Sequence, residues 1–139
     1  QNADRIRRIT PAGVVTNYPL PTTFSNVDGM ASTPDGNVWF TDYGANVIGD
    51  ITPTGAIHEY PDPSPYNGLN AIASGPDGAL WFTRQDGVIG RITPSGALTT
   101  TTLPTPNSQP DGIATGPNDT LWFTELGANR IGSLHVSPG

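Results

Sequence analysis

The most regular pattern along the chain is a run of consecutive apolar residues, Val/Leu-Trp-Phe, followed each time by threonine. Three copies occupy residues 38–41, 80–83 and 121–124, so the pattern returns every 41–42 residues. Consecutive apolar positions in so short a segment predict a β-strand that is buried on both faces. A repeat of about 40 residues without helical spacing is typical of β-propeller blades.

Small residues and turn signals divide each repeat into four strands. Small side chains predict an innermost strand near the crowded axis at 29–32, 71–74 and 112–115. A Pro-Asp-Gly turn follows the first two of these segments. Third strands are expected at 47–52, 88–93 and 130–134. Half-exposed fourth strands, which alternate apolar and polar residues, are expected at 56–60 and 97–101.

The two ends of the chain carry incomplete repeats. Residues 1–22 resemble the outer half of a blade, 29–62 and 71–104 complete blades, and 112–139 the inner part of a blade that another chain completes. The third strand is therefore present twice, at 5–10 and 130–134. The sequence leaves open which copy completes the shared blade.

About three blades do not close a ring, since propellers typically contain four to eight. An open arc exposes the aromatic side chains of its terminal blades, and one tryptophan buries about 150–250 Å² when it is covered. Head-to-tail association of two chains supplies six blades and covers both ends. We therefore predict an all-β partial propeller of four-stranded antiparallel blades, closed as a homodimeric six-bladed ring with exchanged strands.

Composition narrows the possible partners. Twelve acidic residues stand against six arginines and no lysine, for a net charge of −6, which argues against nucleic acid as a partner. The absence of cysteine excludes disulfides and thiolate metal sites. No apolar run is long enough to span a membrane and no signal peptide is present, so no membrane partner is expected. Gln1 as the first residue fits a processed or trimmed product.

Two segments, TLPTPNSQPDGIA at 102–114 and LWFTELGANRIG at 121–132, carry a resemblance to a known family. With the repeats around them they resemble the virginiamycin B lyase family over essentially the whole chain. The resemblance implies a seven-bladed propeller in a chain more than twice as long, and a cytoplasmic location. It also implies a Mg²⁺-dependent elimination that opens the lactone of streptogramin B antibiotics without hydrolysis.

The catalytic histidines of that family precede the Gly-Ile or Ala-Ile that opens an innermost strand, on the substrate face of the ring. Here the corresponding residues are Asp28, Asn70 and Asp111, and both histidines, His58 and His135, lie elsewhere in the repeat. Elimination needs a general base next to the proton that it removes. No catalytic residue is therefore assigned, and we predict a chain without lyase activity.

Asp28, Asn70 and Asp111 are the candidate ligand-binding residues, because one polar side chain per blade would surround the mouth of the channel. Carboxylate and amide oxygens suit Mg²⁺ or Ca²⁺, and they also suit a polar organic ligand. The alternative is a local role, in which short polar side chains hydrogen-bond the backbone where an inner strand begins.

The remaining polar and aromatic candidates have structural interpretations that compete with functional ones. Asp35 and Asp77 fit Pro-Asp-Gly turns. The three tryptophans fit either core packing or carbohydrate pockets between blades: Trp39, Trp81 and Trp122. The residues that follow the repeated threonine differ in charge, which argues against one shared chemistry: Asp42, Arg84 and Glu125. A basic cluster stands near the start of the chain: Arg5, Arg7 and Arg8.

The sequence as a whole predicts a self-assembling propeller module, either a natural fragment or an engineered or ancestral-like protein. The first alternative is a Mg²⁺-dependent carbon–oxygen lyase, which metal-dependent ring opening of a streptogramin B would support. The second is a lectin-like binder, which glycan binding at several sites per ring would support.

Overall fold

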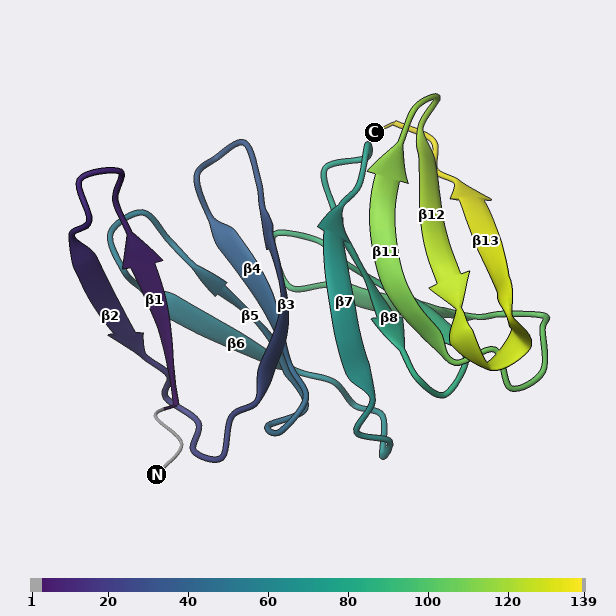
Figure 1. Cartoon of the computed structure of the whole chain (residues 1–139), viewed down its shortest axis with the longest axis horizontal. Helices are drawn as coiled ribbons and strands as arrows, with labels where there is room; N and C mark the ends of the chain where they lie inside the picture. The colour runs from purple at the N-terminus through teal and green to yellow at the C-terminus, as the bar shows by residue number, and fades with distance from the viewer. Residues whose placement is uncertain (1–3, 139) are drawn as a thin grey trace.

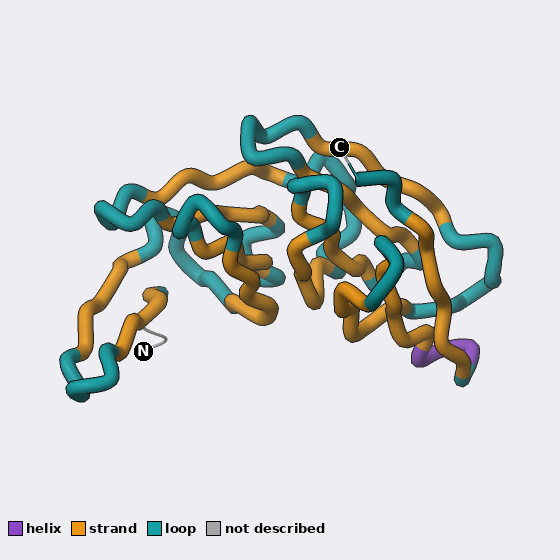
Figure 2. The backbone as a smooth tube through the Cα atoms, turned by 90° about the horizontal axis from the view of Figure 1, so that it is seen from above, coloured by secondary structure: helices purple, strands orange, loops and turns teal. Residues whose placement is uncertain are grey.

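The computed structural model describes residues 4–138 as an open arc of antiparallel sheets, with no strand crossing from one sheet to another (Figures 1 and 2). A two-stranded hairpin lies at one end of the arc and a three-stranded sheet at the other, with two four-stranded sheets between them. The chain therefore has the partial propeller fold that the sequence repeats predict. Within the described residues, no helix is long and apolar enough to cross a membrane.

Strand bounds follow the repeat closely. The N-terminal hairpin consists of β1 (Arg5–Ile9) and β2 (Val15–Pro19). The first blade contains β3 (Val27–Ser32), β4 (Val38–Asp42), β5 (Val47–Ile51) and β6 (Ile57–Pro61). The second contains β7 (Leu69–Ser74), β8 (Leu80–Arg84), β9 (Val88–Ile92) and β10 (Leu98–Thr102). The third contains β11 (Pro110–Gly116), β12 (Thr120–Glu125) and β13 (Arg130–His135), with a 3₁₀ turn at Leu126–Ala128 before β13.

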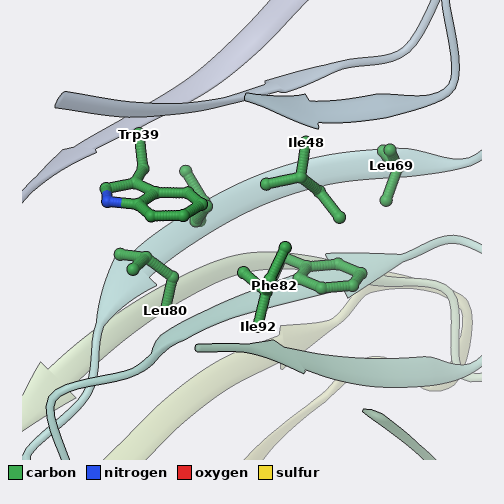
Figure 3. Close-up of a cluster of buried hydrophobic side chains, with 7 residues drawn as sticks. Trp39, Ile48, Leu69, Leu80, Phe82 and Ile92 are labelled. Carbon is green, nitrogen blue, oxygen red and sulfur yellow. The ribbon is translucent and has the colours of Figure 1, made fainter. Parts of the chain in front are cut away.

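The first and second blades are joined by an apolar core to which the tryptophan of β4 contributes. At the first junction Trp39 and Ile48 belong to one cluster with Leu80, Phe82 and other residues of the next blade (Figure 3). Trp39 is 1% exposed, and its indole stacks on the Tyr60 ring with 5.7 Å between ring centroids. Both faces of β4 are thereby buried, as its consecutive apolar residues predict.

In β12 only one face is buried, as expected of the terminal blade of an open arc. Trp122, which holds the position of Trp39 in the third blade, is 47% exposed, and Ile131, which holds the position of Ile48, is 69% exposed. The reason is positional, because residues 4–138 contain no blade beyond the third that would cover this face. The side chains on the opposite face of β12, Leu121 and Phe123, are buried.

The N-terminal hairpin packs on the open face of the first blade. Ile6 and Leu20 form a cluster with Phe40 and Ile51, and Tyr18 packs against its edge. Arg5 to Ile9 pair with Pro19 to Val15 in the register that β5 and β6 use. The hairpin therefore repeats the strand pairing of the two outer strands of the first blade.

A glycine in each third strand lies under the phenylalanine of the second strand. Gly49, Gly90 and Gly132 pair with Phe40, Phe82 and Phe123 respectively. A Cβ added to any of these glycines would collide with the ring of the paired phenylalanine. The close approach of ring and backbone explains why the repeat has glycine at this place.

We expect Gly90→Ala to lower the free energy of unfolding by about 1–3 kcal/mol, because the Phe82 ring is fully buried and can move only by disturbing the junction. Urea unfolding followed by tryptophan fluorescence measures the change. Gly78→Ala is the control for adding a methyl group where no neighbour lies within 4 Å, although its positive φ of 80° brings a separate backbone penalty. An unchanged midpoint for Gly90→Ala would contradict the packing argument.

Candidate functional site

The three candidate ligand residues lie in β-bulges of the innermost strands. The pairing register between first and second strands shifts after Val27, Leu69 and Pro110, directly before Asp28, Asn70 and Asp111. Bulges redirect side chains and are common next to functional sites. They place these three residues at equivalent points of consecutive blades.

A threonine hydroxyl links each bulge to the bulge of the next blade. Thr41 Oγ1 accepts a hydrogen bond from Gly29 N–H at 2.9 Å and donates one to the carbonyl of Asn70. Thr83 Oγ1 accepts from Ala71 N–H at 3.1 Å and donates to the carbonyl of Asp111 at 2.6 Å. These hydroxyls lie at the end of each repeated apolar run. They fix the position of each candidate residue's backbone relative to the preceding blade.

The structure brings two of the three candidates together. The side-chain amide of Asn70 donates a hydrogen bond to Asp111 Oδ1 across the junction between the second and third blades. Both residues line a hollow of about 330 Å³ together with Gln85 and Gln109. Asp28 lies exposed at the corresponding point of the first blade. Threonine hydroxyls bond the backbone where these inner strands begin, whereas the Asn70 and Asp111 side chains bond each other.

Gln85 and Gln109 were not singled out from the sequence. Gln85 follows Arg84 directly, and Gln109 lies two residues before Asp111. The sequence signal for these two residues is that they lie next to repeat positions that carry candidate polar side chains. With Asn70 they present three neutral amides beside one carboxylate. The hollow is thus suited to exchange hydrogen bonds with a polar ligand that carries both donors and acceptors.

One carboxylate, that of Asp111, lines this hollow beside three side-chain amides. Among residues 4–138 no group of three or more histidine, cysteine or acidic side chains is placed to hold a metal. The single carboxylate at the junction, that of Asp111, already accepts a hydrogen bond from Asn70. Magnesium is usually held by one or two carboxylates together with water and substrate oxygens, in near-octahedral geometry.

The aspartates of the Pro-Asp-Gly turns have the turn role expected of them. Asp35 accepts hydrogen bonds from Thr33 Oγ1 and Asn37 N–H, which lower its pKa. Asp77 is less exposed: burial alone would raise its pKa, but hydrogen bonds from Arg91 and Trp81 outweigh that effect and lower it. The indole N–H of Trp81 is thus bound within its own blade.

The tryptophans and histidines lie away from the mouth hollow. Trp39 is enclosed in the first junction and Trp81 lies under Arg91, whose guanidinium is 5.9 Å from the ring centroid. Trp39 therefore offers no free aromatic face for a sugar. His58 lies on β6, where its Nδ1 is 3.0 Å from Asp50 Oδ1, and His135 ends β13. The basic cluster lies on β1, where Arg7 Nε donates to Asn17 Oδ1 across the hairpin.

The residues that follow the repeated threonine are all buried, with three different partners. Asp42 accepts hydrogen bonds from the backbone N–H groups of Asn26 and Ala45 at 2.8 and 3.0 Å. Arg84 forms ion pairs with Asp62 at 3.0 Å and Asp86 at 2.8 Å. Glu125 pairs along the sheet with Arg130. The difference in charge that the sequence displays therefore corresponds to different local contacts.

Comparison with known proteins supports the resemblance in the repeats. The model of the virginiamycin B lyase family matches residues 1–138. The solved virginiamycin B lyase from Staphylococcus aureus is 43% identical with a TM-score of 0.92, and the match covers 99% of this chain and 47% of that protein. A streptogramin B lyase is 37% identical with a TM-score of 0.93, covering 99% of this chain and 46% of that one. No curated protein matches.

A further solved relative is a catalytically inactive histidine-to-alanine variant of the S. aureus enzyme with quinupristin, 43% identical with a TM-score of 0.92. That match again covers 99% of this chain and 47% of the other. The chain thus spans about half the length of these solved relatives. The chain belongs to the virginiamycin B lyase family.

Proposed function

We propose that this chain is a propeller-building unit that associates with a second copy of itself to close a six-bladed ring. The threonine link between blades carries the proposal. Thr41 and Thr83 each donate to the next blade, whereas for Thr124, which accepts from Gly112 N–H at 2.9 Å, residues 4–138 contain no next blade. At the other end the carbonyl of Asp28 holds the position of the two acceptors.

A second link repeats the same polarity. Ser74 Oγ donates to the carbonyl of Ser32, and Thr115 Oγ1 donates to the carbonyl of Ser74. The carbonyl of Thr115 and the hydroxyl of Ser32 are the corresponding groups at the two ends of the arc. Donors and acceptors of both links therefore match head to tail, which is the arrangement that a rotationally closed assembly requires.

The ring so formed would have a polar mouth with binding rather than lyase activity. The family position for a catalytic histidine is occupied by Asp28, Asn70 and Asp111, and an asparagine amide cannot remove a proton as a general base. The Asp111 carboxylate is engaged by Asn70. The hollow with Gln85 and Gln109 favours a polar ligand that it holds through hydrogen bonds.

Light scattering on a sizing column tests the assembly. A mass of twice the chain's 14.6 kDa, stable on moderate dilution, is the expected result. A monomer at all concentrations up to the solubility limit would overturn the proposal. A trimer would do so as well, because nine blades exceed the number that propellers typically contain.

The lack of lyase chemistry has its own test. The chain is incubated with quinupristin and Mg²⁺, and the linear product is followed by chromatography, with S. aureus virginiamycin B lyase as the positive control. We expect no ring opening. Product formed in proportion to the amount of chain would overturn the proposed absence of chemistry and would leave the assembly proposal standing.

A further inference from the structure

A cavity of about 370 Å³ lies between the N-terminal hairpin and the first blade. Arg7 and Arg8 of β1 line it together with apolar side chains, which include Tyr18 of β2, Met30 of β3, Val38 of β4 and Ile51 of β5. The internal repeat of the chain explains the shape of this cavity, because each of these four apolar residues has a counterpart one repeat later.

The counterparts are the residues around Trp39. Forty-two residues after Tyr18 comes Tyr60, which stacks on the Trp39 indole. The counterparts of the other three lining residues belong to the cluster that contains Trp39: Ile72, Leu80 and Ile92. Burial differs as this equivalence requires, since Met30 is 50% exposed whereas Ile72 is 6% exposed. The cavity is therefore a tryptophan socket without its tryptophan.

The tryptophan that fits the socket stands at the other end of the chain. Trp122 occupies the repeat position of Trp39 and is half exposed, and the third blade has no fourth strand to bring a tyrosine against it within residues 4–138. One end of the chain thus has a socket that contains Tyr18 but no tryptophan. The other end has Trp122, which no tyrosine covers. The arc keeps its two ends apart, so the socket and Trp122 of one copy do not meet each other (Figure 2).

We propose that the socket receives Trp122 of a second copy of this chain, with β12 of that copy pairing with β1. The inference rests on the proposed self-association and specifies its interface. This register would set Arg5 opposite Glu125, because Arg5 holds in β1 the position that Arg130 holds in β13. Stacking of Trp122 on Tyr18 would reproduce the Trp39–Tyr60 contact.

One residue of β1 opposes this exchange. Arg7 stands where β5, β9 and β13 have glycine, and at Gly132 any Cβ would collide with the Phe123 ring. For β1 to take the place of β13, the Phe123 ring must shift to admit Arg7. Arg7 therefore weakens the proposed interface where it meets Phe123. Replacing it with glycine, Arg7→Gly, should strengthen the dimer.

The experiment measures the dimer dissociation constant by sedimentation for the wild type and three variants of the full chain. Trp122→Ala should raise the constant about tenfold or more, as removal of a central aromatic residue from an interface does. Arg7→Gly should lower it about tenfold. Arg5→Gly is the matched control, because it removes the same charge from the same strand, and it should not tighten the dimer.

The outcomes separate the two proposals. A wild-type monomer would overturn the self-association itself. A wild-type dimer whose constant is unchanged by Trp122→Ala would leave self-association standing and overturn the socket. A dimer that Trp122→Ala weakens and Arg7→Gly does not strengthen would overturn the pairing of β12 with β1. Iodide quenching of the wild type gives an independent readout, because one accessible tryptophan should become protected as the concentration rises.

Discussion

Replacing Trp39 with alanine is expected to lower the free energy of unfolding by about 3–5 kcal/mol. The indole is enclosed between the first and second blades and stacked on Tyr60, so its removal leaves a large cavity that the two sheets cannot close. Chemical unfolding followed by circular dichroism measures the loss, because the signal does not depend on the tryptophan that is removed.

Trp122→Ala is the matched control for that prediction. It removes the same side chain from the same repeat position, but Trp122 is half exposed. At protein concentrations that keep the chains apart, we expect a loss of about 1 kcal/mol or less. Equal losses for the two variants would show that Trp122 is as deeply packed as Trp39 in the single chain, contrary to the open third blade.

Arg84→Met is expected to lower the free energy of unfolding by about 3–5 kcal/mol, because it leaves the Asp62 carboxylate buried without its cation. Burial alone would lower the pKa of Arg84, but hydrogen bonds with Asp86 and Asp62 raise it above the ordinary value. The guanidinium is therefore charged at neutral pH. The pair connects the segment that leaves the first blade to the end of β8 in the second.

A second substitution should restore most of that stability. Leu20 and Leu103 hold the repeat position of Asp62, so this place in the fold accepts a leucine. We expect Asp62→Leu with Arg84→Met to lie within about 1 kcal/mol of the wild type, since a buried ion pair and an apolar pair of similar volume often contribute equally. A double variant as unstable as Arg84→Met alone would show that Arg84 acts through Asp86 or through packing.

Most of the fold is predictable from the sequence because the same strand and turn signals recur at equivalent positions of each repeat. The apolar runs ending in Thr41, Thr83 and Thr124 locate the second strands, and turn residues at fixed distances locate the others. The exposure of Trp122 is not predictable from its run alone, because the burial of a strand face depends on a neighbouring blade and not on the strand's own residues.

The candidate site could be predicted only in part. Spacing places Asn70 and Asp111 at equivalent points of adjacent blades, but their direct hydrogen bond depends on bulges that form when strands pair. The Asp62–Arg84 pair has no sequence signal of its own. Asp62 lies in a proline-rich connection whose counterparts are leucines, and its partner is a residue 22 positions later in another sheet.

The threonine joints between blades have a consequence for how such a mouth can diversify. Thr41 and Thr83 bind the main-chain carbonyls of Asn70 and Asp111 and make no use of their side chains. In these residues the main-chain carbonyl connects the blades, and the side chain is left to contact a ligand. Substitutions at these mouth positions can alter recognition, or install a proton-transfer group, while the joints that set the curvature of the arc stay intact.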